Sequence, residues 1–210
     1  MTLRILGRAN SFNVRKVLWA CDEIGVPFVR EDWGRGFRPT TDPEFQEINP
    51  IGLVPAVVLE DGTVLRESNT IIRYLATVSG ASTLYPSNPL ARAGVEQWMD
   101  WANYETSISL RGAFLGGQLD EPPWNNPWFV GQGRRLITKE VGQLDAHLAE
   151  TGPFMTGAAF TLADIPIGLV VNRWFNLRFD DKPDYANVAR YYETLSERPA
   201  YLTHGRNGLP

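Results

Sequence analysis

Residues 49–55, which read NPIGLVP, offer a backbone site for a peptide-like ligand. Pro55 stands directly before the β-rich run 56–59, so it can open a strand without removing a hydrogen bond from inside the ladder. The Val54-Pro55 bond can be cis or trans, because sequence spacing does not decide the isomer. In either case the arrangement leaves the backbone N–H and C=O of Val54 able to pair with a bound peptide.

One cysteine and two histidines limit the redox and metal chemistry of the chain. Cys21 cannot form an internal disulfide. Residues 11–14 read SFNV at the start of a predicted helix, where a dithiol exchanger would carry Cys-x-x-Cys. His147 and His204 lie far apart in the sequence, and neither stands beside Cys21. We therefore expect no metal site and no disulfide exchange through protein cysteines.

The first 80 residues predict a small α+β domain. A short apolar run, a helix with apolar positions at helical spacing, and a second apolar run give a strand-helix-strand unit with parallel pairing. A hairpin follows, with Asp61-Gly62 in its turn, and then a helix that Ser68 can cap. The predicted strands are residues 3–6, 28–32, 56–59 and 64–66. The predicted helices lie between Ser11 and Gly25 and between Ser68 and Gly80, and residues 33–48 are mostly loop with one short helix.

The rest of the chain predicts an all-helical domain. Residues 81–89 contain two prolines and serve as the linker, and residues 90–210 show four helical patterns and no strand pattern. The expected helices are residues 92–119, 127–150, 162–178 and 184–198. Before the third, Thr161 to Asp164 resemble a capping box, which predicts helix nucleation at that point.

Composition favours a globular cytoplasmic protein and excludes some partners. The chain has 210 residues, of which 43% are hydrophobic and 21% are charged. The net charge is −4, the pI is near 5.3, and no run of Lys or Arg occurs, which argues against binding to nucleic acid or to an anionic membrane surface. No apolar run approaches the roughly 20 residues that a membrane helix needs. The N-terminus also lacks the features of a signal peptide.

Two stretches together carry a family resemblance. Residues 49–55 and residues 67–75 (ESNTIIRYL) match the two signatures of the glutathione-binding domain in the cytosolic glutathione transferase family, which the chain resembles over nearly its whole length. Residues 161–164 match the folding motif of that family's helical domain. Residues 8–14 (RANSFNV) look like the bacterial theta-like, phi-like or Nu-like members. The resemblance implies a thioredoxin-like N-terminal domain, an all-α C-terminal domain, glutathione as co-substrate with no permanently bound cofactor, and a homodimer used in detoxification.

The resemblance assigns glutathione contacts to four residues. In the family the bond before the proline is cis, and the preceding residue pairs through its backbone with the cysteinyl unit, so these roles pass to Pro55 and Val54. Glu67 and Ser68 match the residues that hold the γ-glutamyl end, Glu67 at its ammonium and Ser68 at its carboxylate, above a helix N-terminus. The alternative for Ser68 is an ordinary helix cap, and one serine can do both.

The resemblance also places a thiol donor at the start of the first helix. A thiol pKa near 8.5 leaves little thiolate at neutral pH, so catalysis needs hydrogen-bond donors directed at sulfur. Ser11 aligns with the serine donor of theta-like and phi-like members, and Asn13 and Asn10 are ranked second and third. The alternative for all three is helix capping. The tyrosine donor of other classes has no counterpart, since no tyrosine precedes Tyr74.

Further contacts are assigned more broadly. Arg15, Arg35 and Arg38 are candidates for the glycyl carboxylate, with Arg35 and Arg38 preferred over the alternative of solvated surface side chains. Asp100 matches an acid that some classes extend across the dimer interface to the glutathione of the other subunit. The electrophile pocket is expected among apolar and aromatic residues, of which about half would belong to the core. These residues are Phe12, Trp33, Tyr104, Ile108, Arg111, Phe114, Leu115, Trp174 and Phe175.

Two other functions remain open from the sequence. A glutathione-dependent disulfide or peroxide reductase would use the same site, because glutathione can supply both thiols. A non-enzymatic scaffold or regulatory module would keep the fold with a broken glutathione site, whereas Val54, Pro55, Glu67 and Ser68 are all present. Conjugation of glutathione to a small hydrophobic electrophile is therefore the preferred prediction.

Overall fold

The structure is a computed structural model, and it describes residues 2–208. The described residues form two compact units. The first unit contains residues 2–86 and 199–208, and the helical unit contains residues 87–198. The sequence instead predicts that everything after residue 90 belongs to the helical domain. The difference arises because the last helix packs on the first helix of the chain, a long-range contact that has no local signature in the sequence.

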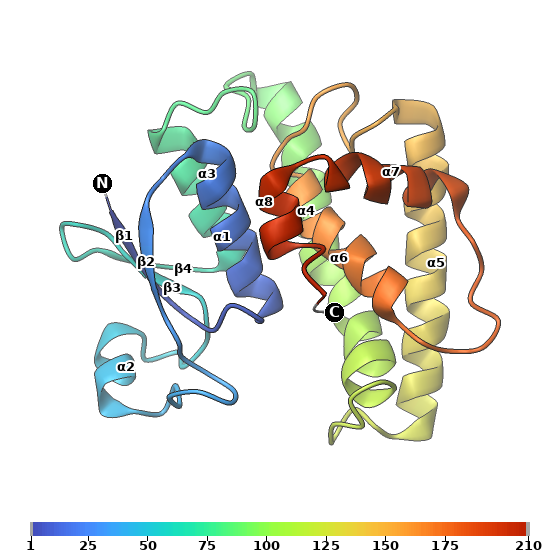
Figure 1. The fold of residues 1–210 in the computed structure, drawn as a ribbon, viewed down its shortest axis with the longest axis horizontal. Coiled ribbons are helices and arrows are strands. Elements are labelled where there is room, and N and C mark those ends of the chain that lie inside the picture. Colours follow the sequence, from blue (N-terminus) through green and yellow to red (C-terminus); the bar gives the residue numbers. More distant parts are fainter. Residues whose placement is uncertain (1, 209–210) are drawn as a thin grey trace. The chain divides into compact units, whose positions relative to one another are not determined.

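A four-stranded mixed sheet forms the centre of the first unit (Figure 1). Its strands are β1 (Leu3–Leu6), β2 (Phe28–Glu31), β3 (Ala56–Val58) and β4 (Val64–Arg66), in the order β2-β1-β3-β4. The parallel β1–β2 pair and the antiparallel β3–β4 hairpin are those that the sequence predicts, and β1 also pairs antiparallel with β3. β2 and β3 each end one residue earlier than predicted, before Asp32 and Leu59. With its helices, this sheet confirms the predicted thioredoxin-like domain.

The first helix of this unit is buried on more than one side. α1 (Phe12–Ile24) ends at Gly25, whose φ of 75° is the left-handed cap geometry that glycine adopts without strain. Residues 14–21 are all buried, because α3 (Ser68–Val78) and α8 (Pro199–His204) both pack on α1. Figure 1 shows α8 alongside α1. The Trp19 and Tyr201 rings lie 4.7 Å apart, and Arg15 donates to the His204 and Gly205 carbonyls.

Long antiparallel and crossing helices form the second unit. They are α4 (Pro89–Leu110), α5 (Pro127–Thr151), α6 (Asp164–Asn176) and α7 (Ala186–Ser196). The helix predicted over residues 92–119 is instead α4 followed by a π-helical segment, η1 (Arg111–Gly116). Glycine allows this segment to approach α5: a Cβ on Gly112 would lie 2.5 Å from the Phe129 carbonyl oxygen and 2.9 Å from the Cα of Gly133. The all-helical class of the second half is confirmed.

Three helices begin with the same local device, an Asx residue followed by proline. The side chains of Asp42, Asn88 and Asn126 accept hydrogen bonds from the first turns of α2 (Pro43–Ile48), α4 and α5. Proline is tolerated at the first helical position because its missing N–H would have no intrahelical partner there. Pro89 therefore opens α4 instead of ending the predicted linker, and α2 is the short helix expected within residues 33–48.

The segment before α6 forms a buried network around one carboxylate. Asp164 has no exposed surface, and its oxygens accept hydrogen bonds from the backbone N–H of Thr161 (2.8 Å) and of Met155 (2.9 Å). The Tyr191 hydroxyl of α7 donates to the same carboxylate at 3.0 Å. The acidic half of the predicted capping box is thus present, and it also ties α6 to α7 and to the preceding loop. Burial raises the pKa of Asp164 to about 6, and these hydrogen bonds oppose that shift.

A second buried carboxyl, Glu140 of α5, lies against α4. Its Oε2 accepts a hydrogen bond from the Ser109 hydroxyl at 2.6 Å, and the residue is 6% exposed. Burial raises the pKa of Glu140 to about 7, and the Ser109 hydrogen bond partly opposes this shift. Above pH 7 the Glu140 carboxyl is therefore ionised and forms a buried negative charge in the helical unit. Lys139 stabilises this charge only weakly.

Glu140→Gln is expected to become more stable relative to the wild type as the pH rises. The folded state binds the Glu140 proton more tightly than the unfolded chain, whose carboxyl pKa is near 4.5, so wild-type stability falls between pH 4.5 and about 7. Glu140→Gln has no titrating group at this position. Its unfolding free energy relative to that of the wild type should therefore rise by about 2 kcal/mol between pH 5 and pH 8. Urea unfolding at both pH values measures this shift. Glu150→Gln, an exposed change on the same helix, is the control, and a pH-independent difference would contradict the interpretation.

Candidate functional site

Residues 49–55 are held in place by one buried side chain. Asn49 is 1% exposed, and its Nδ2 donates to the Leu53 carbonyl at 2.7 Å. Its Oδ1 accepts from the Arg66 Nε at 2.7 Å, while the Arg66 Nη2 donates to the Ile48 carbonyl. Neither Asn49 nor Arg66 was predicted from the sequence to have a role at the site. The sequence feature that could have indicated the role of Asn49 is its position before Pro50 in a turn, where an asparagine side chain often hydrogen-bonds to nearby backbone groups.

The backbone of Val54 is open to a ligand. The Val54-Pro55 bond is cis, which confirms the expectation drawn from the resemblance. Within the described residues, the Val54 N–H and C=O take part in no hydrogen bond. Gly7, at the end of β1, has a φ of 153°, and a Cβ there would lie 3.2 Å from the Val54 Cβ and 2.4 Å from the Val14 Cγ2. Only glycine lets these segments approach so closely, which sequence reasoning did not identify.

Glu67 and Ser68 lie at the start of α3 in an unusual backbone geometry. Glu67 is the N-cap with a φ of 64° and a ψ of 110°, and its exposed side chain does not cap the helix. A left-handed φ in a residue with a Cβ is uncommon, and such strain is concentrated at functional sites. Ser68 is the first helical residue and is 4% exposed. The predicted cap role of Ser68 is therefore wrong, because Glu67 already holds the N-cap position.

The start of α1 lies beside the start of α3. The Ser68 hydroxyl donates to the Asn13 Oδ1 at 3.4 Å, which joins two segments that are 55 residues apart in the sequence. Ser11 is the N-cap of α1 and is 7% exposed, yet its hydroxyl makes no capping hydrogen bond to the helix. Asn10 and Asn13 are both exposed. Ser11 therefore occupies the N-cap position of α1, as the helix-capping alternative predicts, but its hydroxyl does not cap the helix.

The electrostatics at these two helix starts favour an anion. The N-terminus of a helix carries partial positive charge and unpaired N–H groups. Neither α1 nor α3 has an acidic residue in its first turn, and the one carboxylate at either start is that of Glu67, the N-cap of α3, whose side chain does not bond to the helix. A carboxylate or a thiolate placed at these helix starts would therefore be stabilised.

The three arginines proposed for the glycyl carboxylate differ in availability. Arg15 is 1% exposed and is occupied by the carbonyls after α8, which excludes a ligand role that would need its guanidinium at the surface. Arg38 is paired with Asp42 and Glu44 and lies 3.9 Å over the Trp33 ring. Its hydrogen bond to Glu44, followed by that to Asp42, raises the pKa of Arg38. Arg35 is exposed.

The residues proposed for the electrophile pocket divide into core and surface. Trp33, at 1% exposure, belongs to the core cluster with Leu6 and Phe45, and Trp174, also at 1%, is core in the helical unit. Phe114 is buried, with the Arg173 guanidinium 4.1 Å from its ring centroid. The remaining positions have partial or full exposure, and Tyr104 is the most exposed at 81%. They are Phe12, Tyr104, Ile108, Arg111, Leu115 and Phe175.

The Cys21 thiol and the side chains that could ligate a metal ion bear on two other kinds of chemistry. Burial raises the pKa of the Cys21 thiol to about 12, so it remains protonated and unreactive at neutral pH. Among residues 2–208, no group of three or more His, Cys, Asp or Glu side chains is placed to hold a metal ion. The helices in that range are also too short or too polar to cross a membrane.

Comparisons with known proteins agree with this geometry. Residues 10–78 match the family model described as the glutathione S-transferase N-terminal domain. Glutathione S-transferase GstB of Escherichia coli K12 is 35% identical over 199 residues, covering 94% of this chain and 95% of GstB. The theta class glutathione S-transferase of Xanthomonas axonopodis pv. citri, solved with glutathione bound, has a TM-score of 0.88 at 31% identity and covers 99% of both chains.

A second group of relatives is longer. The probable elongation factor 1-gamma 1 of Arabidopsis thaliana is 30% identical over 192 residues, which cover 90% of this chain and 45% of that protein. The near full-length match to GstB, the matching N-terminal domain and the similarity to the theta class structure all agree. The chain belongs to the glutathione transferase family.

Proposed function

We propose that this protein is a glutathione transferase that binds glutathione on its first unit and activates the thiol for attack on a small hydrophobic electrophile. The observation that supports this most is the junction of the α1 and α3 starts through Asn13 and Ser68, in the unit that also carries the unpaired backbone of Val54. A tripeptide with two carboxylates and a thiol needs these groups: a backbone edge for its centre and helix N-termini for its anions.

The glutathione contacts are those that the family resemblance implies, and each one fits the chemistry of its residue. Val54 pairs through its backbone with the cysteinyl unit, Ser68 and the α3 N-terminus hold the γ-glutamyl carboxylate, and Glu67 accepts from the ammonium. The Ser11 hydroxyl donates to the sulfur, which lowers the pKa of the thiol because the donor stabilises the thiolate. The thiolate then attacks the electrophilic carbon, the leaving group departs with the bonding electron pair, and the thiol proton passes to solvent.

Several finer assignments belong to the same proposal. Arg35 and Arg38, both exposed, remain the candidates for the glycyl carboxylate, whereas Arg15 is buried and donates to the carbonyls after α8. Asp100, an exposed residue of α4, would reach glutathione as Asp100 of the partner subunit in a homodimer. A cytoplasmic location is part of this proposal. For the electrophile contacts we retain the six residues with exposed surface and omit the three core side chains, Trp33, Phe114 and Trp174.

Glu67→Gln is expected to weaken glutathione binding by roughly tenfold, because a hydrogen bond between two charged groups is replaced by one to a neutral amide. Glutamine has nearly the same size as glutamate, and it must adopt the same left-handed backbone conformation, with a φ of 64°. Titration calorimetry with glutathione measures the change. Glu47→Gln, an exposed change on α2, is the matched control and should bind as the wild type does. If both variants bind glutathione with the same affinity, Glu67 does not contact glutathione.

The reaction itself is tested with two substrates at one glutathione concentration. Conjugation is followed with chlorodinitrobenzene and disulfide reduction with hydroxyethyl disulfide. A transferase should show the higher kcat/KM with chlorodinitrobenzene. A clear preference for the disulfide would assign the protein to the glutathione-dependent reductases, which use the same binding site.

The relatives named as elongation factors favour one second candidate, a non-enzymatic scaffold with the transferase fold. The intact contact set at Val54, Glu67 and Ser68 favours the enzyme over this candidate. Retention on glutathione-agarose separates the two. Failure to bind at millimolar glutathione would favour the scaffold.

A further inference from the structure

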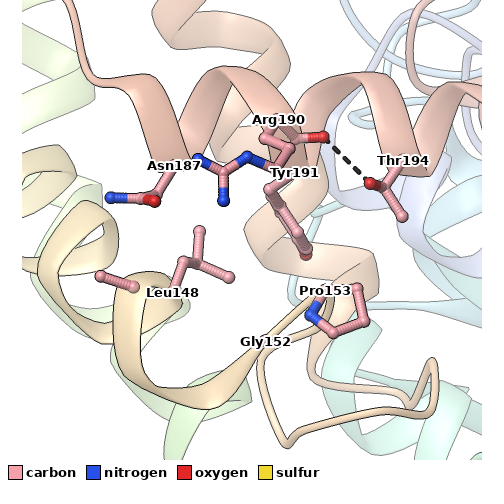
Figure 2. A pocket seen from close by; sticks show the side chains of 8 residues that line it. Leu148, Gly152, Pro153, Asn187, Arg190, Tyr191 and Thr194 are labelled. Carbon is pink, nitrogen blue, oxygen red and sulfur yellow. Dashed lines mark hydrogen bonds between the residues drawn. The ribbon is translucent and has the colours of Figure 1, made fainter.

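A cavity of about 310 Å³ lies in the helical unit, between the C-terminal end of α5 and α7. Its apolar part is formed by Leu148, Ala149 and Pro153, and its polar part by side chains of α7. Figure 2 shows the Arg190 guanidinium on the side of α7 that faces Leu148, with Asn187 and Tyr191 on either side. The cavity contains none of the residues proposed to hold glutathione or the electrophile.

Arg190 is the single charged residue of this lining. Its side chain is exposed, and within residues 2–208 its guanidinium makes no hydrogen bond or ion pair. The Arg190 backbone carbonyl accepts a hydrogen bond from the Thr194 hydroxyl, with 3.0 Å between the two oxygens. A guanidinium presents two parallel N–H groups that match a carboxylate in a bidentate pair.

The neighbouring polar groups of α7 are already satisfied. The Asp145 carboxylate accepts from the backbone N–H of Asn187 at 2.7 Å and of Val188 at 3.0 Å, so the α7 N-terminus is capped. It also accepts from the Asn187 side chain at 3.0 Å. The Tyr191 hydroxyl donates a hydrogen bond to the Asp164 carboxylate at 3.0 Å. Anion recognition in this cavity therefore falls on Arg190 and not on the helix N-terminus.

We propose that this cavity binds a small monocarboxylate with an apolar body, such as an arylacetate, as a second ligand site distinct from the glutathione site. The single cation matches one negative charge, and the Asp145 carboxylate, which is bound to the lining residue Asn187, opposes a dianion. The apolar body packs against Leu148 and Pro153. A volume near 310 Å³ is at the small end of ligand pockets, which suits one ring and a short chain.

Phenylacetate and its uncharged analogue phenylacetamide test this site by titration calorimetry on the full chain. Phenylacetate should bind at least about tenfold more tightly than the amide, because only the acid forms the charge-assisted pair. Arg190→Gln should remove this preference, and Ala149→Phe should abolish binding by filling the cavity. Arg135→Gln, which removes an exposed arginine near the other end of α5, should leave binding unchanged.

Glutathione-conjugating activity is measured on the same variants. It should be unchanged in Arg190→Gln, and the titration does not depend on that activity, so the two proposals fail separately. Absence of phenylacetate binding, equal binding of acid and amide, or an unaltered preference in Arg190→Gln would each overturn the second site.

Discussion

Ser11→Ala is expected to lower kcat/KM with chlorodinitrobenzene at neutral pH by about ten- to hundredfold, because it removes a hydrogen-bond donor to a charged sulfur. The pKa of the bound thiol should rise by about one to two units, since each unit corresponds to about 1.4 kcal/mol of differential stabilisation. Ser11 is 7% exposed and its hydroxyl does not cap α1, so loss of the hydroxyl should leave the helix almost as stable as before. A rate profile from pH 6 to pH 9 measures both effects.

The neighbouring asparagines provide the comparison for this variant. Asn13→Ala and Asn10→Ala change exposed side chains at the same helix start, and each should reduce turnover less than Ser11→Ala. Ser11→Thr keeps the hydroxyl and should recover much of the activity. The thiol-donor role of Ser11 would be refuted by unchanged turnover at neutral pH with an unchanged pH profile.

Asp164→Asn is expected to destabilise the protein by about 3 kcal/mol or more at pH 7. The carboxylate accepts from two backbone N–H groups and from Tyr191, and an amide presents donors where at least one of these acceptors is needed. An unsatisfied buried donor loses its hydration without a replacement, which costs about 1–3 kcal/mol. Urea unfolding followed by far-UV circular dichroism gives the difference.

The pH dependence of this stability difference shows whether Asp164→Asn acts through the buried carboxylate or through a general loss of packing. Because the folded-state pKa of Asp164 is raised to about 6, its contribution to stability is largest below pH 4 and falls as the pH rises to about 6. The stability difference between wild type and Asp164→Asn should therefore narrow between pH 4 and pH 7. Asp184→Asn, an exposed control before α7, should change stability by no more than about 0.5 kcal/mol at any pH. A difference that widens with pH would contradict the assigned pKa.

Local rules of sequence predicted the elements well where the signal lies within a few residues. The Asp61-Gly62 turn, the Gly25 helix end and the alternation of strand and helix correctly predicted the order of elements in the first unit, the parallel β1–β2 pair and the β3–β4 hairpin. The same rules erred at Pro89, because an asparagine cap before proline was interpreted as linker. The predicted division at residue 90 missed α8, since the Trp19–Tyr201 contact joins opposite ends of the chain.

The sequence by itself determined the family, the order of the elements and the types of side chain at the glutathione site. Only the tertiary structure decided which of those side chains are accessible and which meet. Arg15 of α1 is an interior residue, whereas Tyr104 of α4 is exposed, because the helical period identifies a face of a helix and not what covers it. The left-handed backbone at Glu67 and the Asn13–Ser68 hydrogen bond likewise depend on how α1 and α3 pack against each other, which residues 55 positions apart do not encode locally.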